Sequence, residues 1–339
     1  MMSRRTFIVA ELSANHGHRL EVALESIRAA KRAGADAVKI QTYTADTITL
    51  NCDGADFRVK GTLWDGRTLY DLYQEAYTPW EWHEEIFRVA REEGIPCFST
   101  PFDPTAVDLL ERLGNPYYKI ASFEITDVGL IAYAARTGKP MIISTGTALP
   151  EDIDLAVKTC KEAGNEDITL LKCTSAYPAP IEDANLRTMV DMRERYGVKV
   201  GLSDHTTGHD VAVAAVALGA TMVEKHFIMD RAIGGPDAAF SMDQDEFTAM
   251  VRAIRNVEKA MGQVAYPTDP STIKGREFCR SLYIARDMKK GDVFTPETVR
   301  SVRPGFGLPP RCLPEVLGKS VARDVRMGER LTFDLIQNS

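Results

Sequence analysis

The chain has 339 residues, 44% apolar and 26% charged, a balance typical of a soluble globular protein with room for a large α/β domain and a smaller one. Its formal net charge of −7 argues against nucleic acid or an anionic membrane as a partner, because both require a basic face. The six cysteines contain no C-x-x-C pair, so neither a disulfide framework nor a thiolate zinc site is expected. The apolar run before Glu11 is too short for a signal peptide or a membrane span, which predicts a cytoplasmic protein.

Short runs rich in apolar and β-branched residues recur along the first 263 residues, with amphipathic segments between them. One such segment places Leu20, Ala23, Leu24 and Ile27 at helical spacing. Strands that alternate with helices in this way predict a (β/α)8 TIM barrel over residues 1–263. The eight predicted strands are Phe7–Ala10, Ala37–Ile40, Pro96–Ser99, Tyr117–Ala121, Met141–Ser144, Thr169–Leu171, Val198–Leu202 and Met222–His226.

An insertion of roughly residues 42–80 separates the second and third predicted strands. Insertions that follow barrel strands lie on the rim of the active site. Its aromatic residues either pack the insertion onto the barrel or form a platform for a sugar, and we favour packing for most of them. They are Trp64, Tyr70, Tyr73, Tyr77 and Trp80.

A second, smaller domain follows the barrel. Residues 264–276 contain two prolines and polar filler without a clear period, which indicates a linker. Short strands and turns then follow, among them Ser281–Ala285, a Pro- and Gly-rich loop from Arg303, and Val321–Asp324. We therefore predict a β-rich domain over residues 277–339, small enough that we expect it to dock on another surface.

Polar residues follow every predicted barrel strand. Active groups of TIM barrels gather at the carboxyl ends of the strands, so these residues predict an active site. The polar ends are Glu11–His16, Lys39–Thr42, Ser99–Phe102, Lys119–Glu124, Ser144–Thr147, Lys172–Tyr177, Ser203–His205 and Glu224–His226.

Two histidines end neighbouring predicted strands, His205 on the seventh and His226 on the eighth. Adjacent strands lie about 5 Å apart, so the two imidazoles can share one cation. An isolated histidine is more often a hydrogen-bonded core residue, but the paired placement favours a metal site. Two nitrogen ligands with open positions suit Mn²⁺ or another exchangeable divalent ion better than a closed zinc site.

Lysines and hydroxyl groups at the strand ends form a second set. Fixed ammonium groups and hydroxyl donors suit a compact dianion, so this set predicts a cradle for a phosphate and a carboxylate. A salt bridge inside the barrel is an equally good interpretation of either lysine alone. The acidic residues Glu124 and Asp237 lie beside this set in the sequence pattern and are candidates for proton transfer or sugar binding. The cradle candidates are Lys39, Ser99, Thr100, Lys119, Ser122, Ser144 and Thr145.

Taken together, the motifs resemble the N-acetylneuraminate (sialic acid) synthase family over roughly residues 6–337. Members of that family join a TIM barrel to a C-terminal domain similar to type III antifreeze protein, the SAF domain. Any one motif is weak, but their ordered set is highly specific. The matching segments are Glu11–His16, Lys39–Thr42, Ser99–Pro101, Lys119–Glu124, Ser144–Gly146, Gly201–His205, Glu224–Phe227 and Gly235–Asp237.

The resemblance implies roles for individual residues. His205 and His226 would bind a divalent metal, Mn²⁺ first and Mg²⁺ or Co²⁺ otherwise, and Glu124, Asp237 and His205 would be catalytic. The family's antifreeze-like arginine corresponds to Arg303, which implies a domain-swapped homodimer in which the Arg303 loop reaches the partner's active site. The implied phosphoenolpyruvate ligands are Lys39, Thr100, Lys119, Ser122, Ser144, Ser175, Tyr177 and Ser203, and the implied sugar ligands are Asn15, Gln41, Glu124, Asp237, Phe240 and Arg303.

Within that family, four segments look like those of pseudaminic acid synthases: Glu11–His16, Leu63–Tyr73, Thr78–His83 and Gly234–Ser241. This implies condensation of phosphoenolpyruvate with 2,4-diacetamido-2,4,6-trideoxy-altropyranose and water, giving a nine-carbon 2-keto acid and phosphate. The methyl and acetyl groups of that sugar need apolar contacts, for which Phe123, Phe240 and the aromatics of the insertion are candidates.

Gly17 and Ala238 depart from typical sialic acid synthases and leave the acid–base role at the first strand unassigned. Three other functions stay open. The same chemistry on N-acetylmannosamine or on the legionaminic acid precursor is the nearest. A metal-dependent pyruvate aldolase would use the same histidines but release no phosphate. The third is a non-enzymatic protein whose antifreeze-like module binds ice or glycan.

Overall fold

The computed structural model describes residues 5–61 and 65–337, so Leu63 and Trp64 lie outside the described residues. The chain divides into two compact units, residues 1–262 and 263–339. No helix in the described ranges is long and apolar enough to cross a membrane, and all six cysteines are free thiols.

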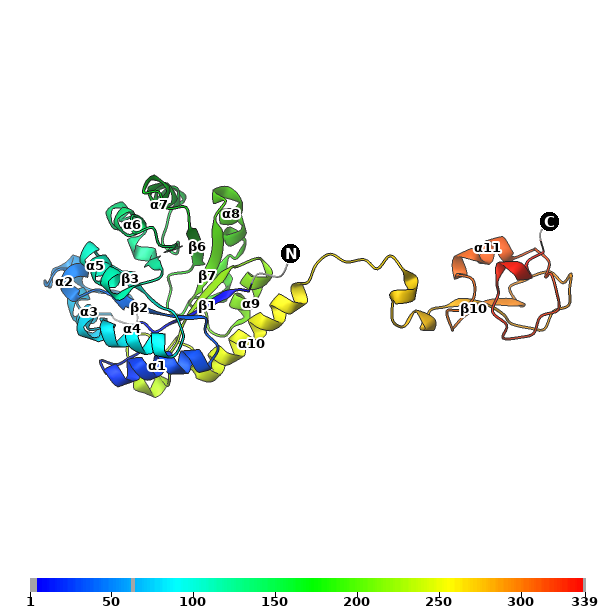
Figure 1. Cartoon of the computed structure of the whole chain (residues 1–339), viewed down its shortest axis with the longest axis horizontal. Coiled ribbons are helices and arrows are strands. Elements are labelled where there is room, and N and C mark those ends of the chain that lie inside the picture. Colours follow the sequence, from blue (N-terminus) through cyan, green and yellow to red (C-terminus); the bar gives the residue numbers. More distant parts are fainter. Residues whose placement is uncertain (1–4, 62–64, 338–339) are drawn as a thin grey trace. The chain divides into compact units, whose positions relative to one another are not determined.

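The first unit is a closed barrel of eight parallel strands that follow one another in chain order (Figure 1). Each predicted strand is present, two with the predicted ends and six with slightly shifted ends, so the predicted TIM barrel is confirmed. The strands are β1 Phe7–Glu11, β2 Ala37–Thr42, β3 Cys97–Pro101, β4 Tyr118–Ile120, β5 Met141–Ser144, β6 Ile168–Cys173, β7 Lys199–Asp204 and β8 Met222–His226.

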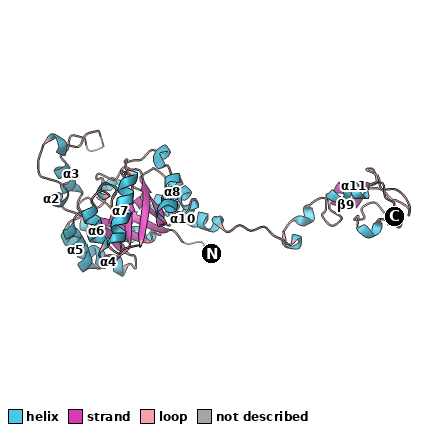
Figure 2. Ribbon diagram, turned by 90° about the horizontal axis from the view of Figure 1, so that it is seen from above, coloured by secondary structure: helices cyan, strands magenta, loops and turns pink. Residues whose placement is uncertain are grey.

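Helices surround the strands on the outside of the barrel (Figure 2). Their ends follow local chemistry: α5 starts where Asp103 accepts hydrogen bonds from the first backbone N–H groups and stops at Gly114, whose φ is 76°. The helices are α1 Leu20–Arg32, α2 Ala45–Ile48, α3 Leu69–Ala76, α4 His83–Glu92, α5 Pro104–Leu113, α6 Val128–Ala135, α7 Pro150–Glu162, α8 Arg187–Tyr196, α9 Asp210–Ala217 and α10 Gln244–Met261.

An apolar layer closes the amino end of the barrel lumen, and we call it the floor. Gly201 of β7 belongs to the same level, because a Cβ there would lie 2.4 Å from the carbonyl oxygen of Met222 and 2.7 Å from Leu171 Cδ2. Only glycine fits this position without moving the neighbouring strands. The floor consists of Val9, Ala37, Phe98, Ile142, Leu171 and Met222.

The insertion between β2 and β3 carries α2 and α3 and lies against the barrel through its aromatic residues. Trp80 Nε1 donates a hydrogen bond to the carbonyl oxygen of Tyr43 at 3.1 Å. The ring centroid of Tyr73 lies 5.7 Å from that of Tyr43, and the Tyr77 ring lies 5.3 Å from His18. Packing onto the barrel is therefore confirmed for Tyr77, whereas Tyr73 and Trp80 pack against Tyr43 within the insertion. The Tyr43 ring in turn lies 5.0 Å from that of Phe102, directly after β3.

The second unit contains a two-stranded antiparallel sheet of β9 Ser281–Ile284 and β10 Val299–Val302, and a short helix, α11 Leu313–Val316. The prediction of a strand at 321–324 is wrong. Val321 pairs with Ile336 and Val325 with Met288, each as an isolated bridge, so the segment changes partner before a ladder can form. A separate apolar core that includes Leu282, Phe294 and Leu331 holds this unit together.

Candidate active site

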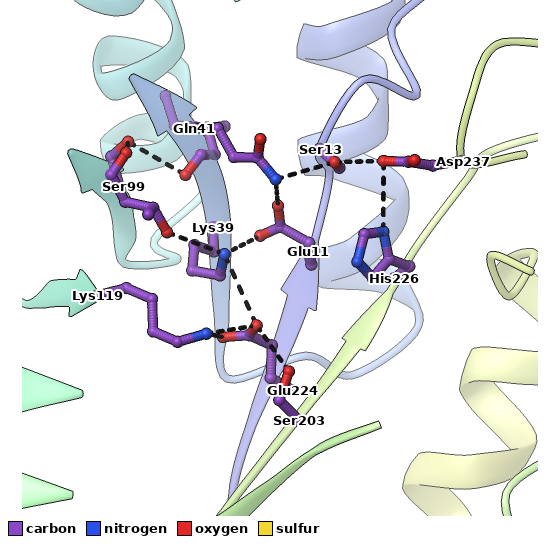
Figure 3. A network of polar contacts seen from close by, with 12 residues as sticks. Glu11, Ser13, Lys39, Gln41, Ser99, Lys119, Ser203, Glu224, His226 and Asp237 are labelled. Atoms are coloured by element: carbon purple, nitrogen blue, oxygen red, sulfur yellow. Dashed lines mark hydrogen bonds and ion pairs between the residues drawn. The ribbon is translucent and has the colours of Figure 1, made fainter. Parts of the chain in front are cut away.

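Four charged side chains meet in the lumen above the floor, and we call them the lumen network: Glu11, Lys39, Lys119 and Glu224 (Figure 3). Lys39 Nζ lies 2.6 Å from Glu11 Oε2 and 3.7 Å from Glu224 Oε1. Lys119 Nζ donates to both oxygens of Glu224, at 2.8 and 3.0 Å. The lysines therefore form salt bridges inside the barrel, the alternative that the sequence had left open.

Strand alternation places these groups together. Side chains two residues apart on a strand point to the same side, so Glu11 and Glu224 follow the floor residues Val9 and Met222 into the lumen. The register pairs Glu11 of β1 with Lys39 of β2 and with His226 of β8.

Burial and mutual attraction set the ionisation of the network. Burial opposes ionisation of Glu224, but the ammonium groups of Lys119 and Lys39 lower its pKa to about 2. Burial lowers the pKa of Lys119, whereas the two carboxylates overcome burial and raise the pKa of Lys39. Burial raises the pKa of Glu11. The network contains two lysines and two glutamates. An anionic ligand that binds the ammonium groups therefore has to share them with the carboxylates that they already contact.

Hydroxyl groups surround the network in a cavity at the carboxyl ends of the strands. Thr100 Oγ1 accepts from Lys39 Nζ at 3.2 Å, and Ser203 Oγ donates to Glu224 at 3.2 Å. The buried Ser144 Oγ has no hydrogen-bond partner in the described ranges. Seven of the eight predicted phosphoenolpyruvate ligands line this cavity: Lys39, Thr100, Lys119, Ser122, Ser144, Tyr177 and Ser203.

The eighth, Ser175, does not line the cavity but lies next to it, 3.9 Å from Cys173 Sγ. The absence of a side chain at Gly146 lets Ser175 approach its backbone, because a Cβ on Gly146 would lie 2.3 Å from Ser175 Oγ. The Gly146 N–H instead donates to Ser122 Oγ at 3.0 Å. Backbone and hydroxyl donors are thus held close together beside the lysines.

His205 and His226 lie side by side at the cavity, with ring centroids 5.3 Å apart. His205 Nδ1 lies 2.9 Å from the carbonyl oxygen of Thr174. Burial lowers the pKa of His226 well below its usual value, which leaves the neutral imidazole that metals bind. Its Nδ1 is buried without a hydrogen-bond partner among the described residues, and the nearest carboxylate oxygen, of Asp237, is 3.7 Å away.

The histidine pair fits a divalent cation. No group of three or more His, Cys, Asp or Glu side chains in the described part of the chain is placed to hold a metal. A cation here would complete its coordination with water or substrate oxygens, as open catalytic sites do.

The predicted sugar ligands that belong to the first unit lie around the upper rim of the network. Gln41 Nε2 donates to Glu11 Oε1 and Ser13 Oγ, both at 3.0 Å, and Ser13 Oγ donates in turn to Asp237 (Figure 3). The amide of Asn15 instead binds the Phe227 carbonyl oxygen at 2.9 Å and Ser241 Oγ at 2.8 Å. Asn15 therefore ties the β1 end to the segment that carries Asp237.

Glu124 and Phe240 complete this rim. Burial raises the pKa of Glu124 to about 7, and one of its carboxyl oxygens has no hydrogen-bond partner among the described residues. The Phe240 ring lies 4.9 Å from His226 and 5.2 Å from Tyr177. Phe123 is 63% exposed. Arg303 lies in the second unit.

Sequence reasoning missed three ionisable residues that line the cavity. Glu11 and Glu224 stood in the recognised motifs without a role, although counting alternate residues from the floor would have aimed both into the lumen. Cys173 also lines the cavity, 3.7 Å from His205 Nδ1. Burial raises the pKa of this thiol, but its contacts with His205 outweigh burial and lower it to about 7.

Comparison with known sequences identifies the family. The family model of the NeuB family matches residues 26–266, and that of the SAF domain matches residues 280–337. The chain belongs to the NeuB family. Its second unit is thereby an SAF domain, as expected from the resemblance to the antifreeze-like module.

The chain is 51% identical to a pseudaminic acid synthase of Campylobacter jejuni, over 97% of this chain and 96% of the relative. It is 48% identical to a pseudaminic acid synthase of Helicobacter pylori over 98% of each chain. An N,N'-diacetyllegionaminic acid synthase of Campylobacter jejuni is 36% identical over 96% of this chain and 98% of the relative. The crystal structure of a sialic acid synthetase from Leptospira borgpetersenii superimposes with a TM-score of 0.70 at 30% identity, covering 79% of this chain and 89% of that one.

Proposed function

We propose that this chain is a pseudaminic acid synthase, which condenses phosphoenolpyruvate with 2,4-diacetamido-2,4,6-trideoxy-altropyranose and water to give pseudaminic acid and phosphate. The observation that carries the proposal is the 51% and 48% identity to two pseudaminic acid synthases over nearly the whole chain, against 36% to a legionaminic acid synthase. The lumen network and the histidine pair supply the groups that this transferase chemistry needs.

Lys39 and Lys119 hold the phosphate and the carboxylate of phosphoenolpyruvate in this proposal. Their partners Glu11 and Glu224 keep both ammonium groups fixed in the dry lumen, so little reorganisation is needed when the substrate arrives. The unpartnered Ser144 Oγ is available as a further donor to the substrate.

His205 and His226 hold a divalent cation, with Mn²⁺ as first choice and Mg²⁺ or Co²⁺ as alternatives. When bound, the cation polarises the aldehyde carbonyl of the open-chain sugar as a Lewis acid. Asp237 lies 3.7 Å from Nδ1 of His226, too far for a hydrogen bond, and is itself held by Ser13.

Proton transfer is assigned to Glu124. Carbon 3 of phosphoenolpyruvate attacks the aldehyde carbon, and the aldehyde oxygen takes up a proton to become a hydroxyl. Water adds to carbon 2 and gives up one proton, and the tetrahedral carbon then loses the second proton from its new hydroxyl as it expels phosphate, which leaves the 2-keto group. A carboxyl with a pKa of about 7 is partly ionised at neutral pH, which suits a base that takes the proton of that water. Asp237 and Phe240 flank the sugar on the other side of the cavity.

Assembly and location belong to the same proposal. We place the enzyme in the cytoplasm, where phosphoenolpyruvate is produced. A domain-swapped homodimer, in which the SAF domain of one subunit carries Arg303 to the sugar site of its partner, is supported by family membership and by the small size of the SAF domain.

Phosphate release tests the proposal. Purified enzyme is incubated with phosphoenolpyruvate, Mn²⁺ and one of three sugars: the altrose derivative, its legionaminic counterpart or N-acetylmannosamine. We expect strong release with the altrose derivative alone. Release only with another sugar would keep the chemistry and replace the substrate, whereas carbon–carbon bond formation from pyruvate without phosphate release would favour the aldolase.

A further inference from the structure

The β7–β8 ladder ends in a pair of charged residues directly before the two histidines. Its last paired positions are Asp204 and Lys225, and the next residues along the strands are His205 and His226. Ser203 and Glu224, one residue earlier, point into the lumen, where they bond to each other. Asp204 and Lys225 therefore point out of the lumen, on the opposite side of the strands from the active site.

This outward pair encloses the backbone of His205. Lys225 Nζ donates to Asp204 Oδ2 at 2.7 Å and to the carbonyl oxygen of Thr206 at 2.5 Å. Asp204 Oδ1 accepts from the Thr206 N–H at 3.0 Å and from Thr206 Oγ1 at 2.8 Å. Asp204, the residue before His205, is thus part of this ion pair, and Thr206, the residue after it, is bonded to both members; we call the pair the outer clamp.

The outer clamp adds a side-chain hydrogen-bond link between the His205 backbone and β8, beyond the strand pairing itself. The other hydrogen bonds of His205 lead toward β6 and the segment after it: its Nδ1 lies 2.9 Å from the Thr174 carbonyl oxygen, and its own carbonyl oxygen accepts from the Ala179 N–H at 3.0 Å. The His226 backbone is fixed separately, since its carbonyl oxygen accepts from the Met242 N–H at 2.9 Å. The two histidine rings also contact each other, but the clamp is what connects backbones whose remaining hydrogen bonds lead to different parts of the barrel.

A buried ion pair is a costly way to fill this place. Both side chains of the clamp are 1% exposed. The outward positions two residues earlier on the same strands hold Leu202 and Val223, which pack without any charge. Apolar residues of similar volume in place of a buried ion pair are often neutral or stabilising. Stability alone therefore does not account for the charges, whereas directional bonds on both sides of His205 do.

We propose that the outer clamp of Asp204 and Lys225 is a positioning device that fixes His205 relative to His226 and thereby sets the affinity of the pair for its divalent cation. The inference rests on the metal site of the proposed function and adds to it two residues that touch neither cation nor substrate. Outer partners that orient metal ligands typically contribute about ten- to a hundredfold to metal affinity.

The test measures Mn²⁺ binding by the metal-free full-length enzyme, by calorimetry and by the electron paramagnetic resonance signal of free Mn²⁺. The variants are Asp204→Asn, which is isosteric, and Asp204→Asn combined with Lys225→Met, which leaves no unpaired buried charge. We expect Mn²⁺ to bind about ten- to a hundredfold more weakly to the double variant. We also expect kcat to recover when Mn²⁺ is raised to saturation. If the double variant does not fold, Asp204→Asn carries the test.

Arg255→Met is the matched control, because Arg255 pairs with Asp36 at 2.6 Å at the other end of the barrel. It is expected to lower the unfolding temperature and to leave Mn²⁺ affinity unchanged. Wild-type Mn²⁺ affinity in the clamp variants, with binding lost in His205→Ala, would overturn the inference and leave the metal site standing. A wild-type enzyme that binds no divalent cation would overturn both.

Discussion

The two ends of the barrel lumen use the same strand geometry for opposite purposes. At the amino end the inward side chains include Val9 and Met222, which pack the floor; two residues further along the same strands stand Glu11 and Glu224. The floor contributes hydrophobic stabilisation, whereas the lumen network places four charges out of water, where stability depends on each keeping its partner. A barrel that needed only to fold could carry apolar inward side chains along the whole lumen. The change from apolar to charged side chains within two residues therefore marks where the substrate site begins.

The largest expected effect is a loss of catalytic efficiency from a change at the carboxyl end of the lumen, with the stability of the fold unchanged. His205→Ala removes one of the two cation ligands and should lower kcat/KM by at least about a thousandfold, because the carbonyl polarisation supplied by the cation is lost. The far-ultraviolet circular dichroism spectrum and the unfolding midpoint should stay close to those of the wild type. A His205→Ala enzyme that stays fully active after metal stripping would contradict the metal assignment.

Lys119→Met should damage both function and stability. It leaves the buried Glu224 with Lys39 at 3.7 Å as its nearest remaining ammonium group. Breaking a buried pair on one side typically costs about 3–5 kcal/mol, which urea unfolding at pH 7 would measure. The KM for phosphoenolpyruvate should rise about ten- to a hundredfold, since a charge-assisted hydrogen bond is lost. A wild-type KM would remove Lys119 from the substrate site.

The same variant changes the acid sensitivity of the fold. In the wild type the lowered pKa of Glu224 contributes stability that is present above the ordinary value of 4.5 and is lost as pH falls toward about 2. Without Lys119 this pKa rises toward its ordinary value, so the variant should lose less stability than the wild type between those two pH values. Unfolding curves at several acidic pH values measure this. If the free energy of unfolding falls with pH equally steeply in the variant and in the wild type, Lys119 does not lower the pKa of Glu224.

A substitution in the floor should lower the free energy of unfolding and leave the catalytic rate nearly unchanged. Phe98→Ala leaves a cavity under the lumen network and should cost about 3 kcal/mol or more in the free energy of unfolding. The kcat of the folded fraction should change less than twofold, a rough expectation because floor residues add to stability alone. A large fall in kcat at full folding would mean that the floor positions the network.

The smallest expected effect is on pH dependence. With a pKa of about 7, Glu124 loses its base form as pH falls, so kcat/KM of the wild type should decline below about pH 7. Glu124→Gln should be slower and lack this decline. Its raised pKa also contributes stability that is complete below pH 4.5 and is lost as pH rises through about 7, and the glutamine variant should lose that dependence too. An unchanged pH profile in Glu124→Gln would assign the proton to another group.

The barrel could be predicted from sequence because each strand is a short apolar run whose meaning is local. The lumen network could not, because its contacts join residues far apart in the chain: Lys119 and Glu224 are separated by 105 positions and meet only when β4 and β8 surround the same lumen. The strand expected at 321–324 failed for the same reason, since pairing depends on a partner that the segment itself does not specify. Asp204 and Lys225 were read as parts of motifs, and only the ladder register shows that they face each other.

The most direct test of the account is a competition between sugars. Equimolar altrose derivative, legionaminic counterpart and N-acetylmannosamine are offered together with limiting phosphoenolpyruvate and Mn²⁺, and the nine-carbon products are separated and identified by mass spectrometry and nuclear magnetic resonance. We predict pseudaminic acid as the dominant product, formed in equal amount to the phosphate released. A dominant product from either other sugar, or phosphate released without a nine-carbon acid, would contradict the account.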